Sequence, residues 1–335
     1  MAQETNYFPS QNVSVWFQKE TAVGNQPDDA GLKKLQTTSF TIPEASVPVE
    51  YASQRAGHFT MTEGQGHHAE GTKLWTFDTV LRGTPDSVKL ACESVFEDAA
   101  SEFRLENNYT FPTATYTNDA GSASTFEIRF ENGGSDATLN NVVCQGCVGT
   151  GFTITQDIGS EGGELVCTIN WATGYYPTIS GDAISSAAYD SGNARTIRTL
   201  AAASCTVGGE PVVIQSWELS CSRTIERIHY ADNTSGTFEP YGYAMTGGFE
   251  VTGSMTCIRN DEIHDLLAKF RDSSVVAINI QDTTASSLTI ALPKCFLNEP
   301  SVDNGGVVLT ETLPFTVVGE DDISSATKML GITIA

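Results

Sequence analysis

The stretch Leu165-Val166-Cys167-Thr168-Ile169-Asn170-Trp171 decides the fold class, because its side chains alternate between two kinds. Every second residue is strongly apolar, and Thr168 and Asn170 stand among the residues between them. Successive side chains of a β-strand point to opposite faces of a sheet. The period of two therefore predicts a strand that has one face in a core.

The same alternation recurs in short runs from residue 32 onward. Residues 126–130 place three apolar side chains on one face, with Glu127 and Arg129 on the other. Apolar residues of one parity also run through residues 249–258 and 288–292. Runs rich in Val, Ile, Thr and aromatic residues, separated by Gly and Asn, predict strands. The sequence therefore predicts a mostly β protein.

Two segments break this pattern with the spacing of short amphipathic helices. In residues 85–96, Thr84 is placed to cap the helix and the apolar residues recur every three or four positions. In residues 261–270, Asn260 is placed to cap, with acidic residues in the first turn and basic residues near the end. Each helix is expected to cover a face or an edge of a sheet.

The order of predicted elements occurs twice along the chain. The first copy has strands near residues 35–42 and 74–81, the helix at 85–96, and strands at 126–130 and 165–171. The second has strands near residues 214–225 and 249–258, the helix at 261–270, and strands at 288–292 and 307–317. We therefore predict a tandem duplication. Its parts are an arm at residues 1–31, a first module at 32–178, a Ser/Ala/Gly/Thr-rich linker or insert at 179–210, and a second module at 211–335.

The composition excludes several classes of protein. The chain has 335 residues, with 18 Lys and Arg against 41 Asp and Glu, and hence a net charge of −23. A protein that grips nucleic acid by neutralising phosphates needs a basic patch, which these few bases do not form. No apolar run approaches the ~18 residues of a membrane span. The first residues lack the pattern of a signal peptide, so we expect a cytosolic site of synthesis.

Cysteine and histidine suggest no metal centre and no cofactor. Without a signal peptide, the eight cysteines are expected to be free thiols buried in the fold. Cys144 and Cys147 have CxxC spacing, but no second pair completes the four ligands of a structural zinc site. His58, His67 and His68 form one cluster, whose Gly-rich context favours a loop over a metal site.

The motifs of the common enzyme classes are also missing from the sequence. It contains no GxSxG, no phosphate-binding loop, no HExxH and no GxGxxG after a strand. We therefore expect no enzymatic activity. A carbohydrate-binding β-sandwich or an enzyme is the alternative, but Trp75, Trp171 and Trp217 lie in alternating strands, where core packing is the simpler role.

Several stretches together carry a family resemblance. They are Val15-Trp16-Phe17-Gln18-Lys19-Glu20-Thr21-Ala22-Val23-Gly24, residues 247–256 (GGFEVTGSMT) with the helix at 260–270, residues 288–294 (LTIALPK), and residues 315–318 (FTVV). In these stretches and in its strand–helix–strand order, the chain resembles the tail tube (major tail) proteins of long-tailed bacteriophages. Residues 178–210 match no pattern of that family.

The resemblance implies a structural role. Members of the family form a β-sandwich or barrel flanked by a helix, and they assemble into rings that stack into a hollow tube for the genome. The expectation is a ring of three subunits with pseudo-sixfold symmetry if the duplication is real, and otherwise a ring of six. Implied partners are tape-measure, tail-tip and tail-terminator proteins, and the implied location is the virion tail, assembled in the host cytoplasm. Another self-assembling tube protein of the same fold is the alternative.

A channel for DNA should repel its cargo, and the net charge of −23 agrees with that role. The polar residues that alternate with apolar ones along the strands are the candidates for the channel wall. They are Thr168 and Asn170 in the first copy, and Glu311 and Thr312 in the second. The arm at residues 1–30 and the loop around residues 57–71 are expected to clamp the next ring.

Overall fold

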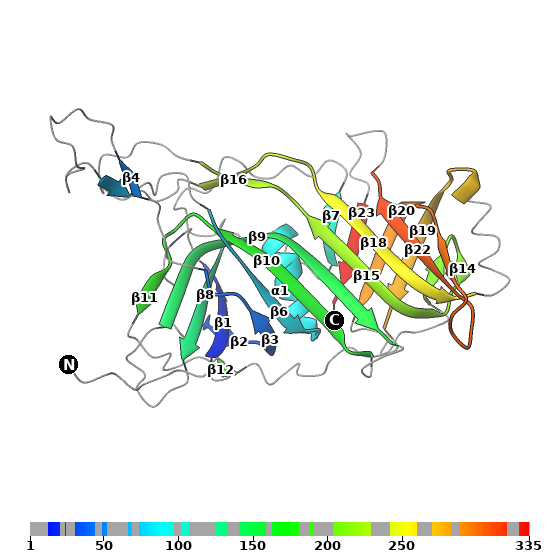
Figure 1. Cartoon of the computed structure of the whole chain (residues 1–335), viewed down its shortest axis with the longest axis horizontal. Helices are drawn as coiled ribbons and strands as arrows, with labels where there is room; N and C mark the ends of the chain where they lie inside the picture. Colours follow the sequence, from blue (N-terminus) through cyan, green and yellow to red (C-terminus); the bar gives the residue numbers. More distant parts are fainter. Residues whose placement is uncertain are drawn as a thin grey trace.

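A computed structural model of the chain has the mostly β fold that the alternation predicts (Figure 1). The structure describes residues 13–20, 24, 31–43, 49–51, 66–68, 74–96, 102–106, 125–132, 141–158, 163–180, 188–189, 204–228, 242–259, 270–282, 288–319 and 328–334. The helix predicted at residues 85–96 is confirmed as α1 (Pro85–Phe96). The helix predicted at residues 261–270 lies outside the described residues, except for Phe270 at its end.

The strands of the first half run from β1 to β12. They are β1 (Val13–Lys19), β2 (Lys33–Lys34), β3 (Thr37–Phe40), β4 (Val49–Tyr51), β5 (Gly66–His68), β6 (Trp75–Arg82), β7 (Glu102–Glu106), β8 (Phe126–Asn132), β9 (Asn141–Asp157), β10 (Leu165–Thr173), β11 (Thr178–Ser180) and β12 (Ala188–Tyr189).

The strands of the second half run from β13 to β23. They are β13 (Thr206–Val207), β14 (Glu210–Pro211), β15 (Ile214–Ser222), β16 (Ile225–Ile228), β17 (Gly242–Met245), β18 (Glu250–Ile258), β19 (Val275–Gln281), β20 (Thr289–Leu297), β21 (Ser301–Asp303), β22 (Thr310–Val317) and β23 (Lys328–Thr333). Nineteen of the described strands form one hydrogen-bonded network, and β4–β5 and β16–β17 form two separate pairs.

Six antiparallel strands form the centre of this network, in the order β6–β10–β9–β15–β18–β22. Figure 1 shows β10, β9, β15 and β18 side by side across the middle of the molecule. Three of the six strands come from the first half of the chain and three from the second. The β9–β15 pair is therefore a seam that joins the halves. The pairing of β7 with β23 joins them a second time.

Strand β9 belongs to two sheets. Its first part pairs with β8 and β11, and its last part pairs with β10 and β15. The sheet that contains β1 and β8 lies against the central sheet, because Phe126 contacts Trp171 and Phe130 contacts Phe77. Helix α1 packs on the same buried face, where Phe96 meets Phe152 edge-on. The first half is therefore a sandwich of two sheets with α1 beside its core.

The strands predicted near residues 74–81, 126–130, 165–171, 249–258 and 288–292 are confirmed. Several other strands were not predicted, among them β9, β19, β23 and also β1, which lies in the expected arm and pairs with β8. The strand predicted at 307–317 begins only at Thr310, and residues 304–308 form an exposed bend. Glu127 and Arg129 do lie opposite the apolar face of β8, but they are buried and form an ion pair.

All eight cysteines are free and buried, as the sequence predicts. Cys144 and Cys147 lie in the bend of β9, and burial raises the pKa of the Cys147 thiol far above its ordinary value. Within the described ranges, no group of three or more His, Cys, Asp or Glu side chains is placed to hold a metal ion. The same part of the chain contains no helix that is long and apolar enough to cross a membrane.

A buried amide bridges the seam. Trp217 of β15 donates its indole N–H to the Oε1 atom of Gln156 in β9, at 2.8 Å. The Nε2 atom of Gln156 donates in turn to the carbonyl of Gly163, also at 2.8 Å. Gln156 and Trp217 are 2% and 3% exposed, so neither group exchanges these bonds for water.

Gln156→Leu should lower the free energy of unfolding by about 2 kcal/mol, because it leaves the Trp217 N–H and the Gly163 carbonyl buried without these bonds. Gln215→Leu, the same change at an exposed residue of β15, should change it by less than about 0.5 kcal/mol. Urea unfolding followed by tryptophan fluorescence measures both. Equal losses in the two variants would contradict a structural role for the amide at the seam.

Candidate functional site

The outward face of the central sheet carries a row of hydroxyl side chains that crosses the seam. Thr168 of β10 pairs with Thr153 of β9, and Thr153 pairs with Ser220 of β15. Ser220 pairs with Thr252 of β18, and Thr252 pairs with Thr316 of β22. Direct partners in a sheet share a face, so five strands contribute one hydroxyl each. Thr153 and Ser220 are joined by a 3.3 Å hydrogen bond between their side chains.

A second row runs parallel to the first. Asp157 pairs with Ser216, Ser216 with Thr256, and Thr256 with Thr312. The hydroxyls of Thr256 and Thr312 lie 3.0 Å apart. We call the outward side of the six strands that carries both rows the polar face.

Three of the four predicted channel residues lie on the polar face. Thr168 and Thr312 belong to the two rows, and Asn170 is exposed and pairs with Asp78 of β6. Sequence alternation indicated one polar side for each strand. It did not reveal that strands from the two halves present these sides together.

Glu311 lies on the opposite, buried face of β22 and is fully enclosed. Its nearest basic group is the guanidinium of Arg259, with Nε 3.9 Å from Oε2. Burial raises the pKa of the Glu311 carboxyl. Glu311 therefore does not share the polar face with the other three candidates, because consecutive residues of a strand face opposite ways.

The polar face is negatively charged. Four carboxylates lie on this side of the six strands. They are Asp157 in the second row, and Asp78, Glu218 and Glu250 on the same face of β6, β15 and β18. Arg82 is the one basic residue in the sequence of the six strands. Glu164 binds the Arg82 guanidinium through both of its carboxylate oxygens, at 2.6 and 2.8 Å from Nη2. The face therefore presents hydroxyls and carboxylates, and its single basic side chain, Arg82, is bound by Glu164.

A second polar centre fastens the chain just after β1. Glu20 is 3% exposed, and its carboxylate accepts hydrogen bonds from the backbone N–H groups of Gly24 and Gly146, at 2.9 and 2.8 Å. The hydroxyl of Thr125 donates to the same carboxylate at 2.6 Å. The Glu20 carboxylate therefore binds Gly24 and also joins this part of the chain to Gly146 in β9.

Glycine is required at both backbone donors. Gly24 and Gly146 have φ angles of 69° and 58°, a region that other residues rarely adopt. A β-carbon on either would also lie within 2.4 Å of the Tyr175 ring, which packs against both. Tyr243 from the second half donates its hydroxyl to the Gly146 carbonyl at 2.7 Å. The bend in β9 is therefore held from both halves of the chain.

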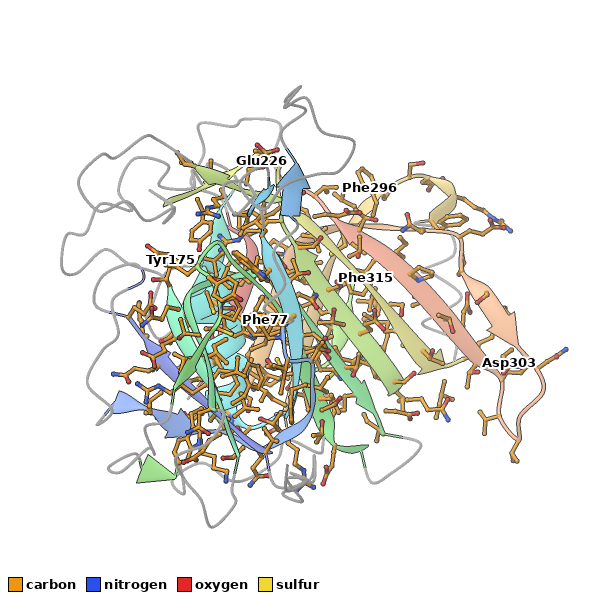
Figure 2. The ribbon with its side chains drawn as sticks, turned by 60° about the vertical axis from the view of Figure 1, so that its left-hand side comes forward. Phe77, Tyr175, Glu226, Phe296, Asp303 and Phe315 are labelled. Atoms are coloured by element: carbon orange, nitrogen blue, oxygen red, sulfur yellow. The ribbon has the colours of Figure 1, made fainter. Side chains whose placement is uncertain are left out.

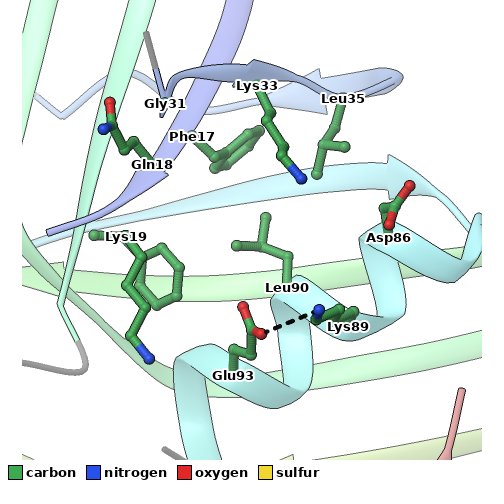
Figure 3. Close-up of a pocket in the computed structure, with 11 residues that line it drawn as sticks. Phe17, Gln18, Lys19, Gly31, Lys33, Leu35, Asp86, Lys89, Leu90 and Glu93 are labelled. Atoms are coloured by element: carbon green, nitrogen blue, oxygen red, sulfur yellow. Dashed lines mark ion pairs between the residues drawn. The ribbon is translucent and has the colours of Figure 1, made fainter. Parts of the chain in front are cut away.

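A cavity of about 390 Å³ opens between β1, β2 and α1 (Figure 3). Its floor is apolar, and its rim has three lysines against two acids, an excess of one base. The apolar residues are Phe17, Leu35, Leu90 and Phe126, and three lysines stand at the rim, Lys19, Lys33 and Lys89, with Asp86 and Glu93 on α1. Lys89 pairs with Glu93 at 3.7 Å. We call this the basic cavity.

Comparison with models of known protein families and with curated proteins finds no match for this chain. The geometry of the polar face is therefore the basis for assigning a function.

Stability should respond to pH through Glu20. Burial raises the pKa of its carboxyl to about 7 from 4.5, only partly offset by its three hydrogen bonds, and the nearby Glu127 raises it further. Between these values the folded state holds a proton that the unfolded state lacks, so this group's contribution to stability falls as pH rises from about 4.5 to about 7.

Glu20→Gln does not titrate, so its stability relative to the natural chain should increase by on the order of 2 kcal/mol between about pH 5 and about pH 8. Gln215→Leu, at an exposed residue without an ionisable group, should show no such trend. Urea unfolding of the three proteins at both pH values gives the comparison. A constant difference between Glu20→Gln and the natural chain would rule out titration of Glu20 in this range.

Proposed function

We propose that this chain is a structural subunit of a phage-type tail tube, which assembles into stacked rings around a channel for genome passage. The observation that carries the proposal is the polar face, an acidic and hydroxyl-rich surface that spans six strands from both halves of the chain. In this proposal the polar face lines the channel.

The chemistry of the polar face suits a conduit for a polyanion. Binding to DNA depends on Lys and Arg at phosphates, and the base of this face, Arg82, is neutralised by Glu164. Carboxylates such as Asp157 and Glu218 repel phosphates over roughly 8 Å at physiological salt. Short hydroxyl side chains keep the wall hydrated without projecting far from the sheet. Passing DNA would therefore meet no attractive charge.

The proposal includes the tandem duplication of residues 32–178 and 211–335. Each half supplies three strands of the polar face, as expected if both are copies of one tube-forming unit. Three chains would then close a ring with pseudo-sixfold symmetry, and a ring of six is the alternative. The partners are further copies of the chain and the tape-measure, tail-tip and tail-terminator proteins of a virion tail. No catalytic role is proposed.

Carbohydrate binding receives no support from the tryptophans. Sugar-binding sites stack their ligands on exposed aromatic rings, but all four tryptophans, Trp16, Trp75, Trp171 and Trp217, are at most 9% exposed. Trp171 and Trp217 belong to the hydrophobic core.

The purified chain at high concentration should form rings and hollow tubes of uniform width. Negative-stain electron microscopy and analytical ultracentrifugation measure this directly. Class averages along the tube axis should have three strong and three weaker lobes if the halves are related copies. A strictly monomeric chain, even beside tail-tip or tape-measure proteins, would contradict the proposal.

Lysine on the polar face should turn a repelling wall into a binding one. Tubes of Thr168→Lys/Ser220→Lys should bind short duplex DNA with an affinity that falls steeply between about 50 and 200 mM salt. Tubes of the natural chain should not bind it. The matched control is Thr246→Lys/Ser274→Lys, which adds the same charge at exposed residues outside the six strands. Fluorescence anisotropy of labelled DNA measures binding, and equal binding by the two variants would argue against a channel at the polar face.

A further inference from the structure

One hairpin exposes an unusual amount of apolar surface. The turn between β21 and β22 and the strand before it are exposed throughout residues 301–309. Four of its side chains are aliphatic, and Val302, Val307, Val308 and Leu309 are 49%, 105%, 49% and 47% exposed. Single exposed aliphatic residues are ordinary, but a contiguous group of them indicates an interaction surface.

The hairpin is structured and acidic. Strand β21 pairs with β22 through three residue pairs, and the Asp303 carboxylate accepts the Gly305 N–H at 2.8 Å. Figure 2 shows Asp303 on a ribbon that projects from the body of the molecule. Asp303 is the charged residue of segment 301–309, Glu299 lies two residues before β21, and the sequence has no Lys or Arg between Lys294 and Lys328.

The basic cavity complements this hairpin in both respects. Its floor is apolar, and its rim carries three of the eight lysines in a chain of net charge −23. Among the described residues, neither Lys19 nor Lys33 forms an ion pair. Figure 3 shows the Lys33 side chain extending over the cavity toward α1. An acidic segment with aliphatic side chains could pack its aliphatic groups on the apolar floor and place its carboxylates beside the lysines of the rim.

The two surfaces belong to different ends of the molecule. In Figure 1, β1 and β2 lie in the left half, and the orange hairpin before β22 lies toward the right-hand end. One chain therefore cannot bring its own hairpin to its own cavity without unfolding. A contact between two unlike surfaces of identical chains is head-to-tail, and such contacts close into rings or continue as filaments.

We infer that the β21–β22 hairpin of one copy docks into the basic cavity of the next copy. The aliphatic side chains contact the floor near Phe17 and Leu90, and the acidic residues lie against the lysines of the rim. This inference rests on the proposed self-assembly and names the surfaces that carry it.

Cysteine crosslinking tests the contact, because all eight native cysteines are buried and introduced surface thiols are the reactive ones. Full-length Val307→Cys and Lys33→Cys chains are mixed, allowed to assemble, and treated with a short bismaleimide. The mixture should give a covalent dimer at least ten times more abundant than either variant alone. The control mixture replaces Val307→Cys with Val275→Cys, an aliphatic residue that is 46% exposed outside the hairpin.

Each outcome separates this inference from the proposed function. Tubes in the microscope without the mixed dimer would overturn the docking contact and leave the tube intact. A Val307→Cys chain that crosslinks to itself would also overturn it, because the hairpins would then pair symmetrically. The mixed dimer without rings or tubes would support the contact and contradict the tube. A monomer in both measurements would overturn both.

Discussion

The pairing of β9 with β15 is the interaction on which the rest of the structure depends. It brings seven consecutive residue pairs into register and merges three strands of each half into one sheet. The buried bond between Trp217 and Gln156 fixes that register from the core side. A slip of one residue would turn the hydroxyl row inward and the apolar row outward. The polar face therefore depends on the register of the β9–β15 pairing.

The two faces of this sheet have different roles. The inner face buries Trp171, Phe152, Leu219 and Phe315, so it supplies hydrophobic stabilisation and fixes α1 and the second sheet. The outer face needs no large side chain for stability, and short hydroxyls with scattered acids occupy it. Such a surface is free to serve as the channel wall in the proposed tube. The exposed residues 301–309 of the hairpin and the basic cavity lie outside the six strands.

Local alternation was enough to predict the elements whose two faces differ in environment. Alternation identified the strand at residues 165–171, and the helical spacing after the Thr84 cap gave the span of α1. Alternation missed β9, because residues 144–151 are largely buried on both sides and show no alternation. It placed Glu311 with the channel residues, because parity alone does not say which side of a strand is enclosed. The role of Glu20 was also beyond local patterns, since its partner Gly146 lies 126 residues away.

A cryo-electron microscopy reconstruction of the assembled chain, at a resolution that traces side chains, would show which surface lines the bore. We expect β6, β10, β9, β15, β18 and β22 there, with Thr168, Ser220 and Thr312 pointing into the bore. A bore lined by lysine and arginine, or a polar face covered by a neighbouring subunit, would rule out the proposed channel wall.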